Sequence, residues 1–98
     1  MIRPLKPRCI GAEPEALYYK PRGIPLSGLE QVVLTLDEVE ALRLKYLEEM
    51  DQTKAAKRMG VSQSTFQRIL VQVNRKTADA LLNGKAIKIE GGVIRKRR

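Results

Sequence analysis

A short part of the sequence gathers side chains that are suited to recognising nucleic acid. Residues 55–70 have the sequence AAKRMGVSQSTFQRIL, in which a glycine separates two short helical patterns. The second pattern opens with amides and hydroxyls and also contains an arginine. Gln can form two hydrogen bonds with adenine and Arg two with guanine, while Ser and Thr bond to several base edges or to phosphate. The chemistry that this segment could perform is therefore recognition of base edges in a DNA groove.

The spacing within residues 52–71 is typical of a helix-turn-helix, in which a tight turn joins a short helix to a second helix. Two steeply crossing helices need a small residue where they approach each other, and Ala56 is placed there. The turn needs a residue that tolerates positive φ, and Gly60 follows four residues later. Phe66 and Ile69 supply apolar anchors for the second helix. The opposite side of that helix is polar and free to face a partner.

Polar side chains on the second helix predict which residues contact DNA. Only the first turns of a recognition helix lie deep in the major groove. We therefore assign base edges to the polar residues of those turns, which are Gln63, Ser64, Gln67 and Arg68. The start of this helix favours phosphate oxygens, since the helix dipole is positive there, and the cations of the helix before it are also placed for phosphate. The phosphate candidates are Lys54, Lys57, Arg58, Ser62 and Thr65, and the recognition helix as a whole is expected at 62–72.

The net charge supports a polyanionic partner. Lys and Arg number 19 and Asp and Glu 11, which gives a formal charge of +8. Such a charge attracts nucleic acid first and an anionic membrane second. An alternative interpretation is a helical bundle whose turn merely resembles the motif. Residues 52–72 contain no acidic residue, however, whereas an ordinary solvated surface would mix the two signs.

Enzymatic activity and metal binding are not expected. The chain has no His and a single Cys, Cys9, which disfavours a structural zinc site, an internal disulfide and the commonest general base. We expect no catalytic residue, no metal and no cofactor. No apolar run approaches the roughly 20 residues that span a bilayer, and the first residues lack the apolar segment of a secretory signal. We expect a cytoplasmic protein that does not contact a membrane.

The N-terminal part of the chain is predicted to be an extended arm. All five prolines lie within residues 1–31, and proline both fixes φ and lacks an amide hydrogen. Residues 1–34 are therefore expected to pack on the core as a proline-rich arm, with short strands at 8–10 and 16–20. The basic beginning, MIRPLKPR, is suited to a narrow minor groove, and the alternative is an unstructured terminus.

Capping residues and periodicity predict three helices within a helix-turn-helix domain at residues 35–84. Thr35 and Glu38 form a capping box for the first helix, and Asp51 and Ser62 cap the other two. Apolar residues recur at steps of three and four, as an amphipathic helix requires. The helices are expected at about 36–49, 52–59 and 63–82, followed by a short β segment at 85–94 and a solvated basic tail at 95–98.

Three segments together resemble a known family. LTLDEVEALRL, AAKRMGVSQSTFQRIL and ADALLNGKAIKIEGG are similar to prokaryotic predicted DNA-binding proteins called domain of unknown function 134, or uncharacterised protein family 0251. The similarity covers about residues 4–92, and the helical part also resembles region four of bacterial sigma factors. The resemblance implies a mainly α fold, namely a sigma-region-four-like helix-turn-helix with an extended N-terminal arm and a short C-terminal β segment. It also implies a role in transcription.

The sequence departs from the family pattern in three places. Gln63 stands where the family is expected to carry Arg, and this change moves the preference from guanine toward adenine. Thr53 stands where a Glu is expected. The chain ends soon after Gly92 without the cysteine-bearing extension of some relatives, so a metal- or cofactor-sensing role is not carried over.

These observations predict a sequence-specific double-stranded DNA-binding protein that regulates transcription. The alternatives are a sigma-like module that contacts RNA polymerase and binds DNA weakly, and a nonspecific nucleic-acid binder. A homodimer is expected because specific affinity usually requires two half-sites. Two dimer surfaces are considered, of which one consists of Ala78, Leu81 and Leu82 and the other of Ile87 and Ile89. The alternative for both sets is that they cover the chain's own arm.

Overall fold

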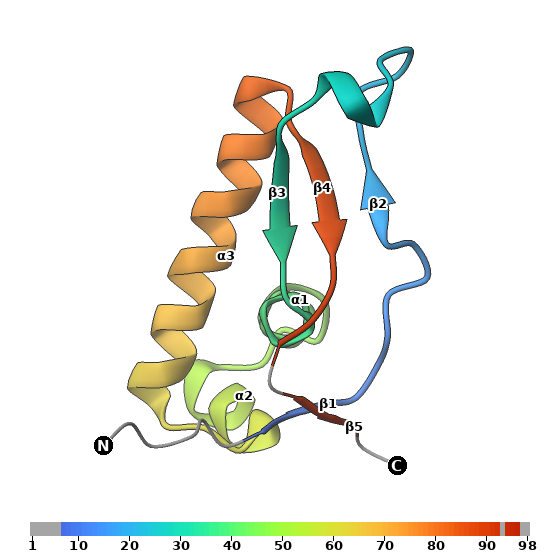
Figure 1. Ribbon diagram of the computed structural model, residues 1–98. Helices are drawn as coiled ribbons and strands as arrows, with labels where there is room; N and C mark the ends of the chain where they lie inside the picture. Colours follow the sequence, from blue (N-terminus) through green and yellow to red (C-terminus); the bar gives the residue numbers. More distant parts are fainter. Residues whose placement is uncertain (1–6, 93, 97–98) are drawn as a thin grey trace, which may run out of the picture.

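The fold is mainly helical, and its three helices surround one core (Figure 1). The computed structural model describes residues 7–92 and 94–96. The helices are α1, Leu36–Leu42, which continues as the π-helix η2, Arg43–Leu47, then α2, Gln52–Met59, and α3, Gln63–Asn83. The strands are β1, Arg8–Ile10; β2, Tyr18–Tyr19; β3, Gln31–Leu34; β4, Ala86–Ile89; and β5, Ile94–Lys96. A 3-10 turn, η1, covers Leu26–Gly28.

The first predicted helix is shorter than expected and changes its winding. The capping box is confirmed, since the backbone N–H of Thr35 donates to Glu38 Oε1 at 2.9 Å. After Leu42 the winding widens, and the N–H of Glu48 donates to the carbonyl of Arg43, five residues earlier, at 2.9 Å. Glu49 then adopts a left-handed conformation with φ of 53°. This residue ends the helical path, which is why it stops at Leu47 rather than at residue 49.

The second and third helices begin at the predicted caps. Asp51 Oδ1 accepts from the N–H of Lys54 at 2.9 Å, and Ser62 Oγ accepts from the N–H of Thr65 at 3.1 Å. Gly60 ends α2 with φ of 73°, as expected of a residue in the left-handed region after a helix. The prediction for α2 is confirmed at both ends, and α3 ends one residue later than predicted.

Five short strands form two small sheets. β4 lies between β3, to which it is parallel, and β2, to which it is antiparallel. β1 and β5 form a separate parallel pair. The predicted strands at 8–10 and within 16–20 are present, whereas β3 was expected only as part of the extended arm. The β2–β4–β3 sheet lies alongside the second half of α3 (Figure 1).

The C-terminal β segment divides between the two sheets. Gly91 and Gly92 connect them with φ of 74° and 99°, and a Cβ atom at Gly92 would lie 2.8 Å from Asp37 Oδ1. The glycine is therefore required both by backbone conformation and by this close approach to α1. The backbone of Arg95 and Lys96 pairs with β1, so strand structure extends into the expected tail, although the side chain of Arg95 is exposed as expected. Residues 1–6 of the expected minor-groove arm and residues 97–98 of the tail lie outside the described part of the chain.

The core joins the helices to the larger sheet. Its most enclosed large side chains include Leu44, Met59, Phe66 and Val73, and Val32 of β3 closes the core from the sheet side. Because these residues come from η2, α2, α3 and β3, packing fixes how α2 and α3 are oriented against the body. Within the described part of the chain, no helix combines the length and the apolar character that crossing a bilayer requires.

Candidate nucleic-acid interface

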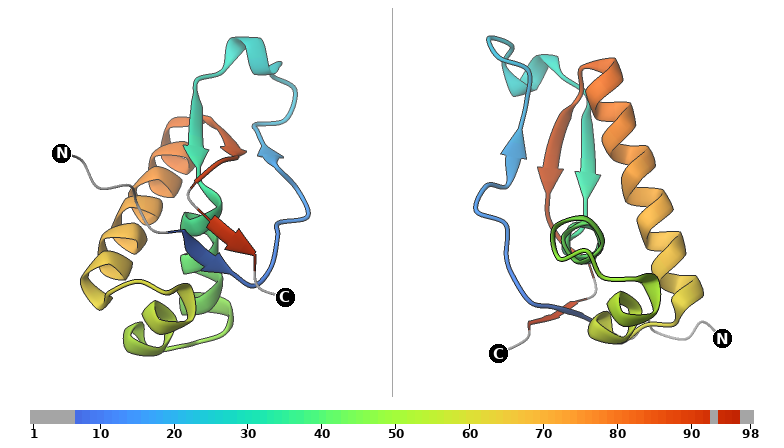
Figure 2. Two further views of the ribbon diagram at one scale, coloured as in Figure 1. Left: turned by 60° about the horizontal axis from the view of Figure 1, so that its bottom comes forward. Right: turned by 180° about the vertical axis from the view of Figure 1, so that it is seen from behind.

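The predicted turn residues occupy the junction between α2 and α3. Ala56 is buried, and its carbonyl accepts from the N–H of Val61 at 3.0 Å, which folds the chain back over the end of α2. Gly60 provides the left-handed residue in that turn. Figure 2 shows α2 and the first turns of α3 together at one end of the molecule, with β1 beside α2. Both structural residues therefore stand where the sequence placed them.

The side chains assigned to base edges share one exposed surface on the first two turns of α3. All of them are solvent-exposed, and they are Gln63, Ser64, Gln67 and Arg68. A shallow hollow of about 430 Å³ continues this surface along α3 and is lined by Gln67, Arg68, Val71, Gln72 and Arg75. Arg75 was not among the predicted contact residues. We call the four base-edge candidates together the recognition surface.

Each residue of the recognition surface has a polar neighbour. The strongest contact is between helices, since Gln52 Nε2 of α2 donates to Gln67 Oε1 at 2.6 Å. Thr53 Oγ1 lies 3.5 Å from Gln63 Oε1, which is long for a hydrogen bond from a hydroxyl. Two further contacts lie within the first turns of α3, with Ser62 Oγ 3.2 Å from Ser64 Oγ and Arg68 Nη2 3.4 Å from Thr65 Oγ1.

The predicted phosphate contacts fall into two groups. Lys54, Lys57 and Arg58 are exposed on α2, and together with Met50 they line a second hollow of about 400 Å³. Ser62 and Thr65 are engaged in the cap of α3, because Ser62 Oγ donates to Thr65 Oγ1 at 2.9 Å and accepts from the N–H of Thr65 at 3.1 Å. The cationic group is thus displayed to solvent, whereas the hydroxyl group also stabilises the helix start.

Carboxylates of α1 are turned inward and paired. Glu40 accepts from Arg43 Nε at 2.8 Å and from the N–H of Gly11 at 2.8 Å, and the hydrogen bond from Arg43 raises the pKa of that guanidinium. Asp37 lies 3.9 Å from the guanidinium of Arg8. These buried acids add no negative charge to the surface beside the cations of α2, and α2 itself contains no acidic residue.

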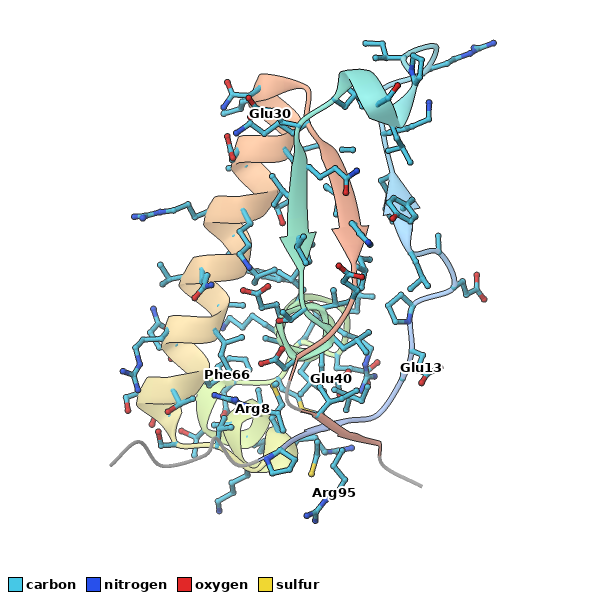
Figure 3. All side chains as sticks on the ribbon, viewed as in Figure 1. Arg8, Glu13, Glu30, Glu40, Phe66 and Arg95 are labelled. Atoms are coloured by element: carbon cyan, nitrogen blue, oxygen red, sulfur yellow. The ribbon has the colours of Figure 1, made fainter. Side chains whose placement is uncertain are left out.

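At the opposite end of the molecule, one lysine is paired with two acids. Lys85 Nζ lies 3.0 Å from Asp79 Oδ2 and 3.2 Å from Glu30 Oε2. Hydrogen bonds from Asn83 and Lys85 lower the pKa of Asp79, and those to Asp79 and Glu30 raise the pKa of Lys85. Figure 3 shows Glu30 at this end, whereas Arg8 and Arg95 lie at the end that α2 occupies. The two ends therefore differ in charge character.

The structure separates the two dimer surfaces that the sequence offered. Leu81 and Leu82 are 74% and 85% exposed at the end of α3, beside exposed Ala78. Ile89 is buried, and Ile87 packs against the core. The strand surface is therefore wrong as an exposed apolar patch, because both isoleucines complete the monomer's own core.

For two residues that contact the recognition surface, the sequence analysis did not predict this contact. Gln52 and Thr53 form the first turn of α2, and each lies beside a base-edge candidate. Neither belongs to an apolar repeat or to a capping motif, so periodicity gave no signal for them. Among the described residues, no three His, Cys, Asp or Glu side chains gather as a metal site would require.

Comparison of the sequence with known proteins identifies a family and several relatives. The family profile described as "Protein of unknown function DUF134" matches residues 1–97. A UPF0251 protein of Caldanaerobacter subterraneus is 54% identical over 92 residues, which cover 94% of this chain and 78% of the relative. A UPF0251 protein of Dehalococcoides mccartyi is 56% identical over 94 residues, which cover 96% of this chain and 80% of the relative. No solved structure matches the chain significantly.

Proposed function

Since the chain belongs to the DUF134 family, whose description assigns no activity, we propose a function from the chain's own geometry: sequence-specific binding of double-stranded DNA. In this proposal the first two turns of α3 enter the major groove, and the recognition surface contacts base edges. The cations of α2 contact the phosphates on one side of that groove. The turn at Gly60 sets the relation between the two helices, so both contacts form at once.

One observation carries the proposal. Gln63, Ser64, Gln67 and Arg68 are all exposed on one helix end, next to a helix that exposes three cationic side chains. Side chains that combine amide, hydroxyl and guanidinium groups match the donors and acceptors of the major groove. A packed bundle surface would instead cover these groups or pair them with carboxylates. The exposure and polarity of the recognition surface and the charge of α2 therefore all support double-stranded DNA as the partner.

We propose that the DNA-binding activity serves transcription regulation. The arrangement of a short helix, a left-handed glycine and a long capped helix supports the similarity to region four of sigma factors. A regulator must find its site among many competing sequences, which requires selectivity as well as affinity. The amides of the recognition surface provide hydrogen-bonding groups for selectivity, and the cations of α2 provide affinity.

We also propose that the protein binds its site as a homodimer through Leu81 and Leu82. Two half-sites of an operator lie about 34–36 Å apart on one face of the duplex. Gln67 and Leu82 are separated along α3 by about 22 Å, given the helical rise per residue. A two-fold axis beside Leu82 would give the required spacing when the two α3 helices diverge at about 100°. The pairing of Lys85 with Asp79 and Glu30 would reduce repulsion between two basic chains that meet there.

A second candidate function is a protein-interaction module that contacts RNA polymerase and binds DNA weakly. An apolar groove of about 450 Å³ lies between the arm and the α1–η2 helix, and its lining includes Pro14, Val39, Leu42, Tyr46 and Leu47. Tyr46 and Leu47 are 54% and 78% exposed, which favours a contact with another protein. This groove and the recognition surface involve different side chains, so variants can separate the two functions.

Selection of bound duplexes from a random pool, at two salt concentrations, tests the proposal. Specific recognition predicts a selected sequence that binds at least about 10³-fold more tightly than random duplex. Steep salt dependence without a preferred sequence would indicate a nonspecific binder. Weak binding to every duplex at low salt would favour the protein-interaction module, and capture of purified RNA polymerase by the wild type but not by Leu47→Glu would support it.

A further inference from the structure

Gln52 and Gln67 join the two helices of the candidate interface. The amide Nε2 of Gln52 donates to Oε1 of Gln67 at 2.6 Å. Gln52 is the first residue of α2 and half-buried, whereas Gln67 is exposed in the second turn of α3. The two residues are 15 positions apart, so the bond exists only because the turn brings the helices together.

The bond leaves a defined set of hydrogen-bonding groups on Gln67. A side-chain amide has one oxygen with two lone pairs and one nitrogen with two hydrogens. Gln52 occupies one lone pair of Oε1, which leaves the other lone pair and both Nε2 hydrogens for a ligand. A bidentate contact with adenine needs one acceptor and one donor from the same amide. The pair therefore retains everything that such a contact requires.

The bond also decides how these groups are arranged. A free glutamine amide can turn by half a rotation, which exchanges the positions of its oxygen and nitrogen. Adenine presents its N6 donor and N7 acceptor in a fixed order along the groove, so only one of the two orientations matches a given base at a given position. While Gln52 donates, the oxygen of Gln67 faces α2, and the exchanged orientation of Gln67 would require the amide of Gln52 to turn over as well.

We infer that Gln52 is a positioning residue that fixes the amide of Gln67 in one orientation and thereby selects adenine at the base that Gln67 contacts. This inference rests on the proposed DNA-binding function and adds a residue that acts through another side chain. The bond forms before DNA arrives, so less rotational freedom is lost on binding. Gln52 thus contributes to selectivity without touching the base itself.

The test uses two variants of Gln52 in the full chain, each put through selection from a random pool. Gln52→Ala removes the donor, so we expect the preference at the Gln67 base to relax and affinity for the selected site to fall about 3- to 10-fold. Gln52→Glu supplies only acceptors, so Gln67 must turn Nε2 toward it. We expect this variant to select a different base at that one position and the wild-type bases at all others.

Matched measurements separate positioning from general effects. Thr53→Ala changes the neighbouring residue in the same turn and should leave the preference at the Gln67 base unchanged. In a Gln67→Ala background, Gln52→Ala should have no further effect on base preference. If Gln52→Glu lowers the affinity equally for duplexes with any base at this position, the new charge merely repels phosphate. This result would overturn the inference.

Two outcomes distinguish failure of the inference from failure of the proposed function. If the wild type selects a sequence and both Gln52 variants select the same one, Gln52 does not position Gln67, although the DNA-binding proposal stands. If the wild type selects no sequence, the DNA-binding proposal fails and the inference fails with it. In the free protein, loss of the Gln67 side chain should also shift the side-chain amide resonance of Gln52 in NMR spectra. An unchanged resonance would overturn the inference without reference to DNA.

Discussion

Glu38 and Lys76 form an ion pair in which Oε1 and Nζ lie 2.9 Å apart, joining the first turn of α1 to the middle of α3. The same carboxylate oxygen accepts from the N–H of Thr35 at 2.9 Å, and Lys76 also donates to the carbonyl of Val33 at 2.9 Å. Glu38 is only 4% exposed. The ion pair therefore connects α1 to α3, and Lys76 extends the connection to β3.

Replacing Lys76 by Met should destabilise the fold by about 2–3 kcal/mol, because it leaves the buried charge of Glu38 without its cation. The estimate lies below that for a fully enclosed pair, since the side chain of Lys76 is 28% exposed. Urea unfolding followed by circular dichroism measures the change. Arg75→Met is the matched control on the exposed neighbour and should remain within about 0.5 kcal/mol of wild type. Equal midpoints for the two variants would contradict the prediction.

Substitutions at Gly60 should destabilise the protein in a graded order. Its φ is 73°, and a Cβ atom there would lie 3.9 Å from Cys9 Sγ, so conformation rather than space opposes a side chain. Gly60→Asn should lower the free energy of unfolding least, and Gly60→Ala should lower it by about 1–2 kcal/mol. Gly60→Val should lower it most, because a β-branched residue is strongly disfavoured at positive φ. Thermal melts would establish the order. Gly28→Ala is the control, since Gly28 has no positive φ, and a Gly60→Val melt like the wild type would exclude this turn geometry.

Local signals in the sequence were sufficient to place the helices and the turn. Asp51, Ser62 and Gly60 act through contacts with residues at most four positions away, and such contacts can be recognised in a single sequence. Exposure of the recognition surface also followed from local periodicity, because the apolar positions of α3 determine which side faces the core. The exposure of these side chains was therefore predicted before any tertiary contact was known, and their contact with DNA stays a prediction.

Contacts between distant parts of the chain could not be predicted in this way. The valines of β3 acquire a strand partner only because β4 arrives more than fifty residues later. The pairing of Arg95 with Cys9 in β5 and β1 likewise has no local signature. The same reason explains why Gln52 was missed, since its partner Gln67 is adjacent only after α2 and α3 have packed.

Truncation of Gln67 should affect one base position only. If its amide contacts a base edge, Gln67→Ala should weaken binding to the selected site by about 1–3 kcal/mol. Binding to a site altered at that one base should change little. Fluorescence anisotropy with the selected duplex and its three single-base alternatives would measure this difference. Gln72→Ala is the control for loss of an exposed amide on the same helix. An equal loss on all four duplexes would reassign Gln67 to the DNA backbone.

Removal of one α2 cation should change the salt dependence of binding. Each phosphate contact contributes about −0.9 to the slope of log affinity against log salt, so Lys57→Ala should make the slope less negative by about that amount. The loss should be the same on selected and random duplexes, because phosphates carry no sequence information. Lys85→Ala is the control, since this lysine pairs with Asp79 and Glu30 at the other end. A slope that Lys57→Ala leaves unchanged would remove Lys57 from the phosphate contacts.

Leu82 provides the test of the dimer. Its side chain is 85% exposed at the end of α3, and burying it against a second copy would remove apolar surface from water. Leu82→Glu should convert a two-copy species into a monomer in sedimentation equilibrium, because two copies of the new charge would meet at the axis. On DNA, the variant should bind a two-half-site duplex no more tightly than a single half-site, whereas the wild type should gain from the second. Leu47→Glu, at a leucine of similar exposure beside the apolar groove, should leave both measurements unchanged. A wild type that sediments as a monomer with and without its selected duplex would exclude this dimer, and a Leu82→Glu protein that still pairs would place the interface elsewhere.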